Sequence, residues 1–106
     1  MLKCYRDERG FAHADAPPGR EILGTFVVQD LQGDLADCKE MLELAEDVVK
    51  GRRPEWSGTG NAHAIRMSQS GITIENLWDE SLGCFTFSFD EFREAVMDWI
   101  AFVTKQ

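Results

Sequence analysis

Ser88 and Glu91, followed by a stripe of apolar residues, constrain this chain more than any other feature of its sequence. Their spacing is that of a capping box, in which the serine side chain and the glutamate side chain satisfy free amides of a helix start. Phe87 and Phe92 flank the cap as a hydrophobic staple does. The stripe predicts one buried helix face, formed by Phe89, Phe92, Val96, Trp99, Ile100 and Val103.

An earlier helix is predicted from the same spacing. Asp30 or Asp34 is expected to cap its start, and Lys50-Gly51 suits its end. Its apolar stripe is Leu31, Leu35, Cys38, Met41, Leu42, Ala45, Val48 and Val49.

Strands are predicted at 2–7, 11–15, 21–28, 62–69, 72–78 and 84–87. Strict alternation and Ser70-Gly71 favour a hairpin over 62–78, Gly24 suggests a bulge, and 52–61 reads as a loop. We therefore expect an α+β fold: one domain over 1–106, with an antiparallel sheet of five to six strands and two helices on one face, in the order βββαβββα. Apolar residues make up 43% of the chain, which suffices for a core.

The formal net charge of −8 makes nucleic acid an unfavourable direct ligand and favours a basic protein partner. Cys4, Cys38 and Cys84 are too few and too scattered for a disulfide framework, which indicates a reducing compartment. With no signal peptide or membrane span in the pattern, we expect a cytoplasmic protein without a membrane partner. The oligomeric state is left open.

No catalytic or metal-binding motif stands out, so we expect a protein that is not an enzyme and needs no cofactor. The sequence lacks a Gly-x-Ser-x-Gly elbow, a P-loop lysine and any Cys-x-x-Cys pair. The alternative is a small enzyme or ligand-binding domain with a pocket around His13, His63 and Cys84.

Acidic residues concentrate on both predicted helices. The segment from Asp30 to Val49 contains seven acidic residues and one basic residue, Lys39. The segment from Glu75 to Asp98 also contains seven acidic residues and one basic residue, Arg93. Such faces lack the usual i,i+4 ion pairs, which favours a partner-binding surface. Trp56, in the predicted loop, and Trp78, at a strand end, are candidate anchors. The expected partner-binding residues are Asp37, Glu40, Glu43, Asp47, Trp56, Trp78, Asp79 and Glu80.

Short motifs spread over most of the chain resemble small YacL-like bacterial proteins. These motifs are Tyr5-Arg6-Asp7 with Gly10, Gly19-x-Glu21-Ile22-Leu23-Gly24, Lys50-Gly51, Trp56, Gly60-Asn61, and Phe92, Trp99 and Phe102 in the last helix. The resemblance implies an α+β cytoplasmic protein and brings no catalytic residues.

Size, charge and architecture also resemble the immunity proteins of contact-dependent growth inhibition and related polymorphic toxin systems. That resemblance implies a protein that neutralises a cognate toxin, a basic nuclease domain, by covering its active site with acidic side chains. Our leading hypothesis is such an immunity protein. The alternative is a YacL-like housekeeping protein without a toxin partner.

Overall fold

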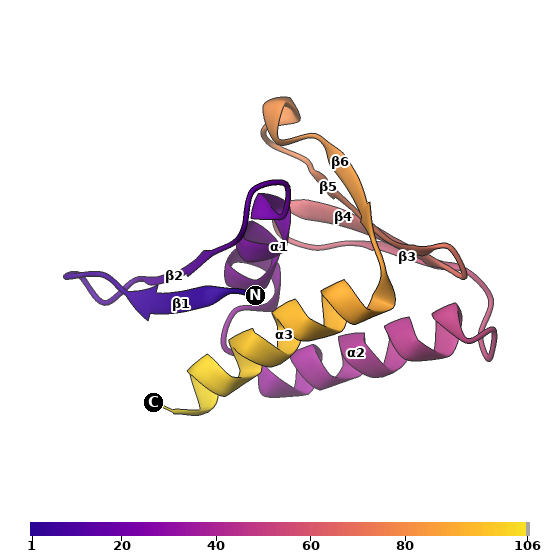
Figure 1. Cartoon of the computed structure of the whole chain (residues 1–106), viewed down its shortest axis with the longest axis horizontal. Coiled ribbons are helices and arrows are strands. Elements are labelled where there is room, and N and C mark those ends of the chain that lie inside the picture. The colour runs from indigo at the N-terminus through magenta and orange to yellow at the C-terminus, as the bar shows by residue number, and fades with distance from the viewer. Residues whose placement is uncertain (106) are drawn as a thin grey trace.

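The computed structural model describes residues 1–105, so the domain predicted over 1–106 includes one residue outside the described part. Its first half comprises β1 (Lys3–Arg6), β2 (Ala12–Asp15), α1 (Glu21–Phe26), the π-helical turn η1 (Val27–Leu31) and α2 (Leu35–Val49). Its second half comprises β3 (Trp56–Thr59), β4 (His63–Ser68), β5 (Gly71–Asn76), the 3₁₀ turn η2 (Glu80–Leu82), β6 (Cys84–Phe87) and α3 (Phe89–Thr104) (Figure 1).

The α+β class is confirmed, but the single sheet of five to six strands is wrong. All described strand pairs are antiparallel and form two sheets, a β1–β2 hairpin and a four-stranded β3-β4-β5-β6 meander. The β1–β2 hairpin projects to one side of the body, with α1 between it and the larger sheet (Figure 1). The predicted order βββαβββα is therefore also wrong.

The strand predicted over 21–28 is helical, as α1 and the start of η1. The buried residues Ile22, Leu23, Phe26, Val27 and Leu31 recur at helical spacing, and their burial outweighs the strand preference of β-branched and aromatic side chains. Gly24 is not a bulge. It lies where α1 meets β2, and a Cβ there would be 2.2 Å from the Ala14 carbonyl oxygen.

The predicted helix signals are confirmed. Asp34, not Asp30, caps α2 and accepts the Asp37 amide, while Lys50 ends the helix and Gly51 follows with a φ of 77°. Ser88 and Glu91 form a complete capping box on α3. The hairpin predicted around Ser70-Gly71 is formed by β4 and β5.

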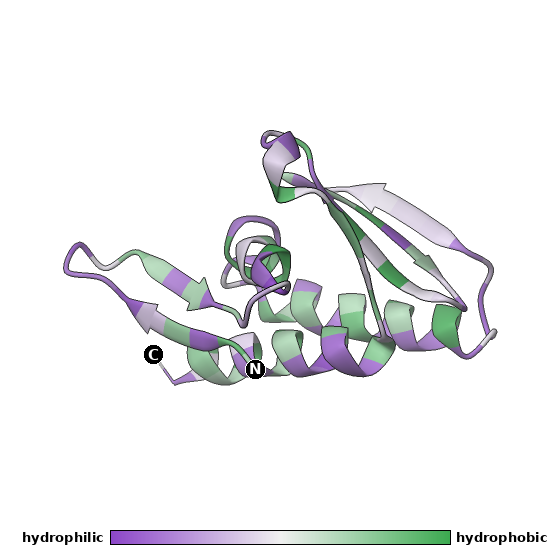
Figure 2. Cartoon of the chain, turned by 45° about the horizontal axis from the view of Figure 1, so that its top comes forward, coloured by the Kyte–Doolittle hydropathy of each residue, from purple (hydrophilic) through white to green (hydrophobic). Residues whose placement is uncertain are grey.

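The core lies between the larger sheet and the helices. The inner sheet face carries the buried side chains Ile65, Met67, Ile72, Ile74 and Phe87. Helices α2 and α3 lie side by side below the sheet (Figure 2), and their buried residues belong to the same hydrophobic core as those of the sheet. No helix in the described residues 1–105 has the length and apolar character of a membrane span.

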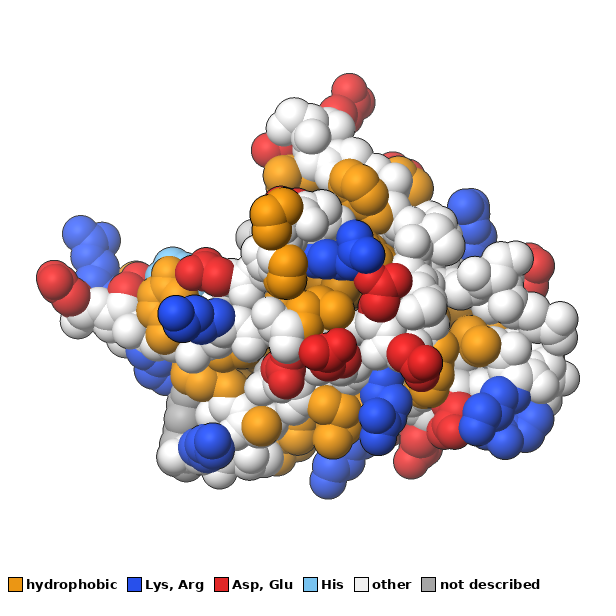
Figure 3. Space-filling model, in the orientation of Figure 1, with side chains coloured by type: hydrophobic (Ala, Val, Ile, Leu, Met, Phe, Trp, Pro, Cys, Tyr) orange, Lys and Arg blue, Asp and Glu red, His pale blue; other side chains and the backbone are white. Residues whose placement is uncertain are grey.

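Helix α3 holds the N-terminal part of the chain in place. The Trp99 indole donates to the Gln32 carbonyl, and Arg20 pairs with Glu91. The Met1 amino group contacts Glu94 at 3.0 Å and Asp98 at 2.8 Å. Acidic and basic side chains are interspersed on this face of the molecule (Figure 3).

Candidate partner-binding groove

A half-open groove of about 290 Å³ lies between α2 and the β3–β4 hairpin. Its lining comprises Phe26, Asp30, Leu31, Asp37, Glu40, Met41, Leu44, Trp56, Thr59, Gly60 and Ile65. Asp37, Glu40, Met41 and Leu44 fall on one side of α2 because they are spaced three, four and seven residues apart. The groove therefore combines an apolar floor and walls with a rim of two carboxylates.

The carboxylates of α2 differ in whether they have partners. Asp37, Glu40 and Glu43 are exposed, and their side chains form no hydrogen bond or ion pair within residues 1–105. Asp47 instead pairs with Arg52 at 2.8 Å, and with Glu43 it lines a second hollow next to the groove. Three of the four predicted helix residues thus remain free to meet a partner, while Asp47 is engaged within the chain.

The second predicted acidic face, on α3, is largely neutralised inside the molecule. Glu91 pairs with Arg20, and Glu94 and Asp98 hold the Met1 amino group. Burial alone raises the pKa of Glu91, but hydrogen bonds from Ser88 and the Arg20 guanidinium outweigh it and hold that pKa below its usual value. Within residues 1–105, α2 thus has three carboxylates without a partner, whereas α3 has one, Asp90.

Trp56 lies on β3, not in a loop as predicted. It pairs with Met67 of β4, is half-buried, and lines the groove. Its indole leans over Gly58, where a Cβ would lie 2.5 Å from the ring carbon Cη2. Glycine at position 58 gives the ring the space to lie along the sheet. The structure therefore brings together Trp56, Asp37 and Glu40, three of the residues predicted to bind a partner.

Trp78, Asp79 and Glu80 belong to a different region. They lie at and beside η2, which Figure 1 places at the end of the molecule opposite α2. Trp78 is 81% exposed, yet its indole is fixed by donating to the Asn61 carbonyl at 3.1 Å. Asp79 caps η2 by accepting the Ser81 amide at 3.0 Å. The eight predicted residues thus do not form one patch.

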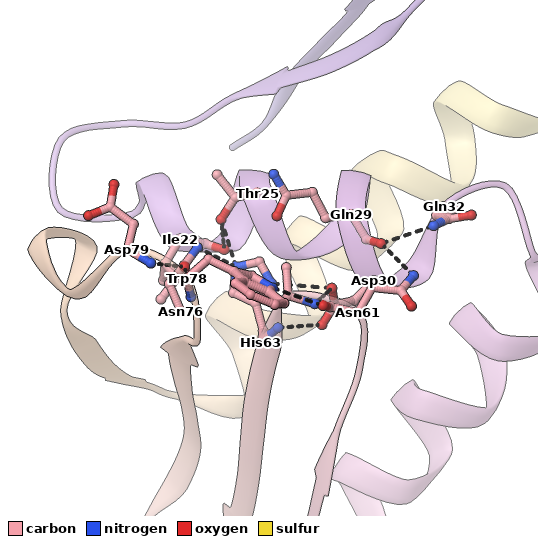
Figure 4. A network of polar contacts seen from close by, with 11 residues as sticks. Ile22, Thr25, Gln29, Asp30, Gln32, Asn61, His63, Asn76, Trp78 and Asp79 are labelled. Atoms are coloured by element: carbon pink, nitrogen blue, oxygen red, sulfur yellow. Dashed lines mark hydrogen bonds and ion pairs between the residues drawn. The ribbon is translucent and has the colours of Figure 1, made fainter.

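Sequence reasoning missed a buried polar network centred on Asp30 and His63 (Figure 4). The Asp30 side chain is only 5% exposed, and its two oxygens accept the amides of Ala62 at 2.9 Å and His63 at 3.1 Å. His63 Nε2 lies 2.9 Å from Thr25 Oγ1 and 3.4 Å from Asn76 Nδ2. Asp30 thereby fastens η1 to the β3–β4 turn, a long-range role with no local signal.

His63 and its neighbours form a structural network and lack the features of a catalytic triad. The His63 Nδ1 atom lies 3.3 Å from Asp30 Oδ1 but makes no hydrogen bond, and the ring is fully buried. Thr25, the hydroxyl next to His63, lies inside α1 and donates to the Ile22 carbonyl. The backbone amides around it belong to the helix and are not arranged as an oxyanion hole.

The alternative pocket around His13, His63 and Cys84 is not formed in the described residues. His13 pairs with Asp7 at 2.8 Å and stacks on Tyr5 in the β1–β2 hairpin, whereas Cys84 is exposed and lines a hollow with Arg66 and Glu75. No group of three or more His, Cys, Asp or Glu side chains in residues 1–105 is arranged to hold a metal ion. Burial raises the thiol pKa of Cys38 to about 11, which keeps that thiol protonated at neutral pH.

Comparison with known proteins gives a distant similarity. The chain is similar to UPF0231 proteins of Shewanella sp. strains MR-4 and MR-7, each 22% identical over 100 aligned residues that cover 80% of this chain and 81% of the relative. No family model matches the chain. No solved structure matches it significantly. The resemblances to YacL-like proteins and to immunity proteins remain predictions, and the functional argument rests on the groove.

Proposed function

We propose that this chain is a cytoplasmic binding protein that receives a basic surface of another protein on α2 and the adjoining groove. In its specific form, it is an immunity protein that covers the active site of a toxin domain, a basic nuclease. The observation that carries the proposal is a set of three carboxylates that have no partner among residues 1–105, Asp37, Glu40 and Glu43, beside a half-open groove with apolar walls.

Each half of this arrangement supplies one requirement of a protein interface. The free carboxylates attract a basic partner from a distance and suppress acidic competitors. The groove offers apolar surface from Met41, Leu44 and Trp56, whose burial provides the affinity that exposed ion pairs lack. A nuclease surface built to hold phosphates presents the complementary charge, so the acids of α2 take the place of its substrate.

The experiment is co-expression of the tagged chain with the gene directly upstream, followed by a pulldown and a growth test. We expect a stoichiometric complex and protection from the upstream domain, both weakened when Glu40→Lys and Glu43→Lys are combined. Glu75→Lys is the matched control, because Glu75 is equally exposed but lies on the outer face of the sheet. Absence of both complex and protection would refute the proposal and favour the YacL-like housekeeping alternative.

A further inference from the structure

The groove contains the chemical groups that bind a long cationic side chain. Two α2 residues, Met41 and Leu44, supply apolar wall, and Trp56 faces them from β3. Asp37 and Glu40 are exposed at the rim, and their side chains accept no hydrogen bond within residues 1–105, whereas the oxygens of the largely buried Asp30 already accept two backbone amides. Negative charge is thus available at the rim, next to an apolar surface.

We propose that this groove is an arginine pocket, which takes the side chain of one arginine from the basic partner inferred above. This inference rests on the proposed function. The aliphatic stem of an arginine lies on apolar walls, as such side chains do when they cover hydrophobic surface. Its planar guanidinium stacks on the indole of Trp56 and forms paired hydrogen bonds with a rim carboxylate.

Arginine fits these groups better than lysine or an apolar side chain does. A guanidinium presents its donors in a rigid plane that matches both a carboxylate and an aromatic ring, whereas an ammonium is a strongly hydrated point charge. An apolar anchor leaves the two rim carboxylates without partners while reducing their contact with water. The combination of one tryptophan with two free carboxylates therefore selects a guanidinium.

Gly58 acts as a positioning residue for this pocket. The Trp56 indole occupies the place that a Cβ on residue 58 needs, since that atom would come within 2.5 Å of the ring. Gly58→Ala is therefore expected to displace the indole and weaken arginine binding, even though residue 58 does not line the groove.

The test is an NMR titration of the full chain, labelled with ¹⁵N, using N-acetyl-arginine N-methylamide as the probe. The citrulline and norleucine counterparts serve as a neutral isostere and an apolar occupant. We expect the indole N–H signal of Trp56, assigned with Trp56→Phe, to shift saturably with the arginine probe alone. The indole signals of Trp78 and Trp99 should stay in place.

Neutralised variants give the deciding comparison. Asp37→Asn combined with Glu40→Gln should weaken probe binding by about fivefold or more, since charge-assisted bonds are lost. Glu75→Gln is the control, because Glu75 is an exposed carboxylate on the outer face of the sheet and does not line the groove. Equal binding of citrulline or norleucine, or binding unchanged by the double neutralisation, overturns the arginine pocket.

The two proposals fail separately. A cognate complex that depends on Glu40 and Glu43, together with no response to the arginine probe, overturns the pocket but leaves the proposed function standing. Selective arginine binding without any protein partner supports the pocket and refutes the proposed function.

Discussion

Asp30 holds the β3–β4 turn, and removing its carboxylate is expected to destabilise the protein severely. Two backbone amides, those of Ala62 and His63, donate to it, and its side chain is only 5% exposed. Hydrogen bonds to charged groups contribute about 1.5–3 kcal/mol each, so Asp30→Ala should lower the free energy of unfolding by about 3–6 kcal/mol. That is a large share of the roughly 5–15 kcal/mol that stabilises a typical domain.

Asp30→Asn tests the same reasoning without a change of size. The amide oxygen of asparagine takes the place of one carboxylate oxygen, but the new NH₂ group points at a backbone N–H and cannot accept a hydrogen bond from it. We therefore expect a loss of about 2–3 kcal/mol, between the wild type and the alanine variant. The loss should come from stability alone, with an unchanged dependence on urea concentration.

The assay is urea unfolding followed by fluorescence, with hydrogen exchange of individual amides as a second measurement. Exchange at Ala62 and His63 should accelerate in both variants. Glu43→Gln is the control, since an exposed and unpaired carboxylate should change stability by no more than about 0.5 kcal/mol. An asparagine variant within that margin of the wild type, with both amides still protected, would refute the anchoring role.

Three further predictions concern contacts between distant parts of the chain. Gly24→Ala should lower the free energy of unfolding by about 1–3 kcal/mol, because its Cβ overlaps the Ala14 carbonyl; the melting temperature reports this. Glu91 has a lowered pKa, so its stabilisation is present above the unfolded-state pKa of 4.5 and lost as pH falls; Glu91→Gln should reduce the loss of stability on acidification. The Met1 amino group donates hydrogen bonds to Asp98 and Glu94, which raise its pKa above 8.0. In a chain that begins at Met1, stability should therefore fall as pH rises above 8.0 through the folded-state pKa, and Asp98→Asn should diminish this fall in unfolding measured from pH 7 to 10.

Much of the fold could be predicted because its signals are local. The capping box of Ser88 and Glu91, the cap at Asp34 and the alternation around Gly71 each depend on neighbours within a few residues. The segment 21–28 was mispredicted for the opposite reason. Its β-branched and aromatic residues favour a strand locally, but the contacts that decide its conformation come from the sheet and from α3.

The candidate site could be predicted only in part, for a related reason. The acidity of α2 is visible in the sequence, and so is Trp56 as an anchor. Whether a carboxylate is free depends on where distant cations fall, and the sequence gives no sign that the Met1 amino group would occupy Asp98. Nor does it show that Trp56 lies on a strand across the groove from Glu40, since a four-residue strand that contains Gly58 and is followed by Gly60 resembles a continuous loop.

The attachment of the N-terminal segments to α3 has a consequence for synthesis. The Gln32 carbonyl accepts its hydrogen bond from Trp99, which follows 67 residues later in the chain. At about 5–20 residues per second, the ribosome needs roughly 3–13 seconds to synthesise that interval. Until then α1 can pack only against β2 and the larger sheet, without the part of its apolar surface that α3 covers. The nascent chain is therefore expected to remain open to proteases and chaperones until its last helix leaves the exit tunnel, and a message truncated before Trp99 should yield no stable fragment.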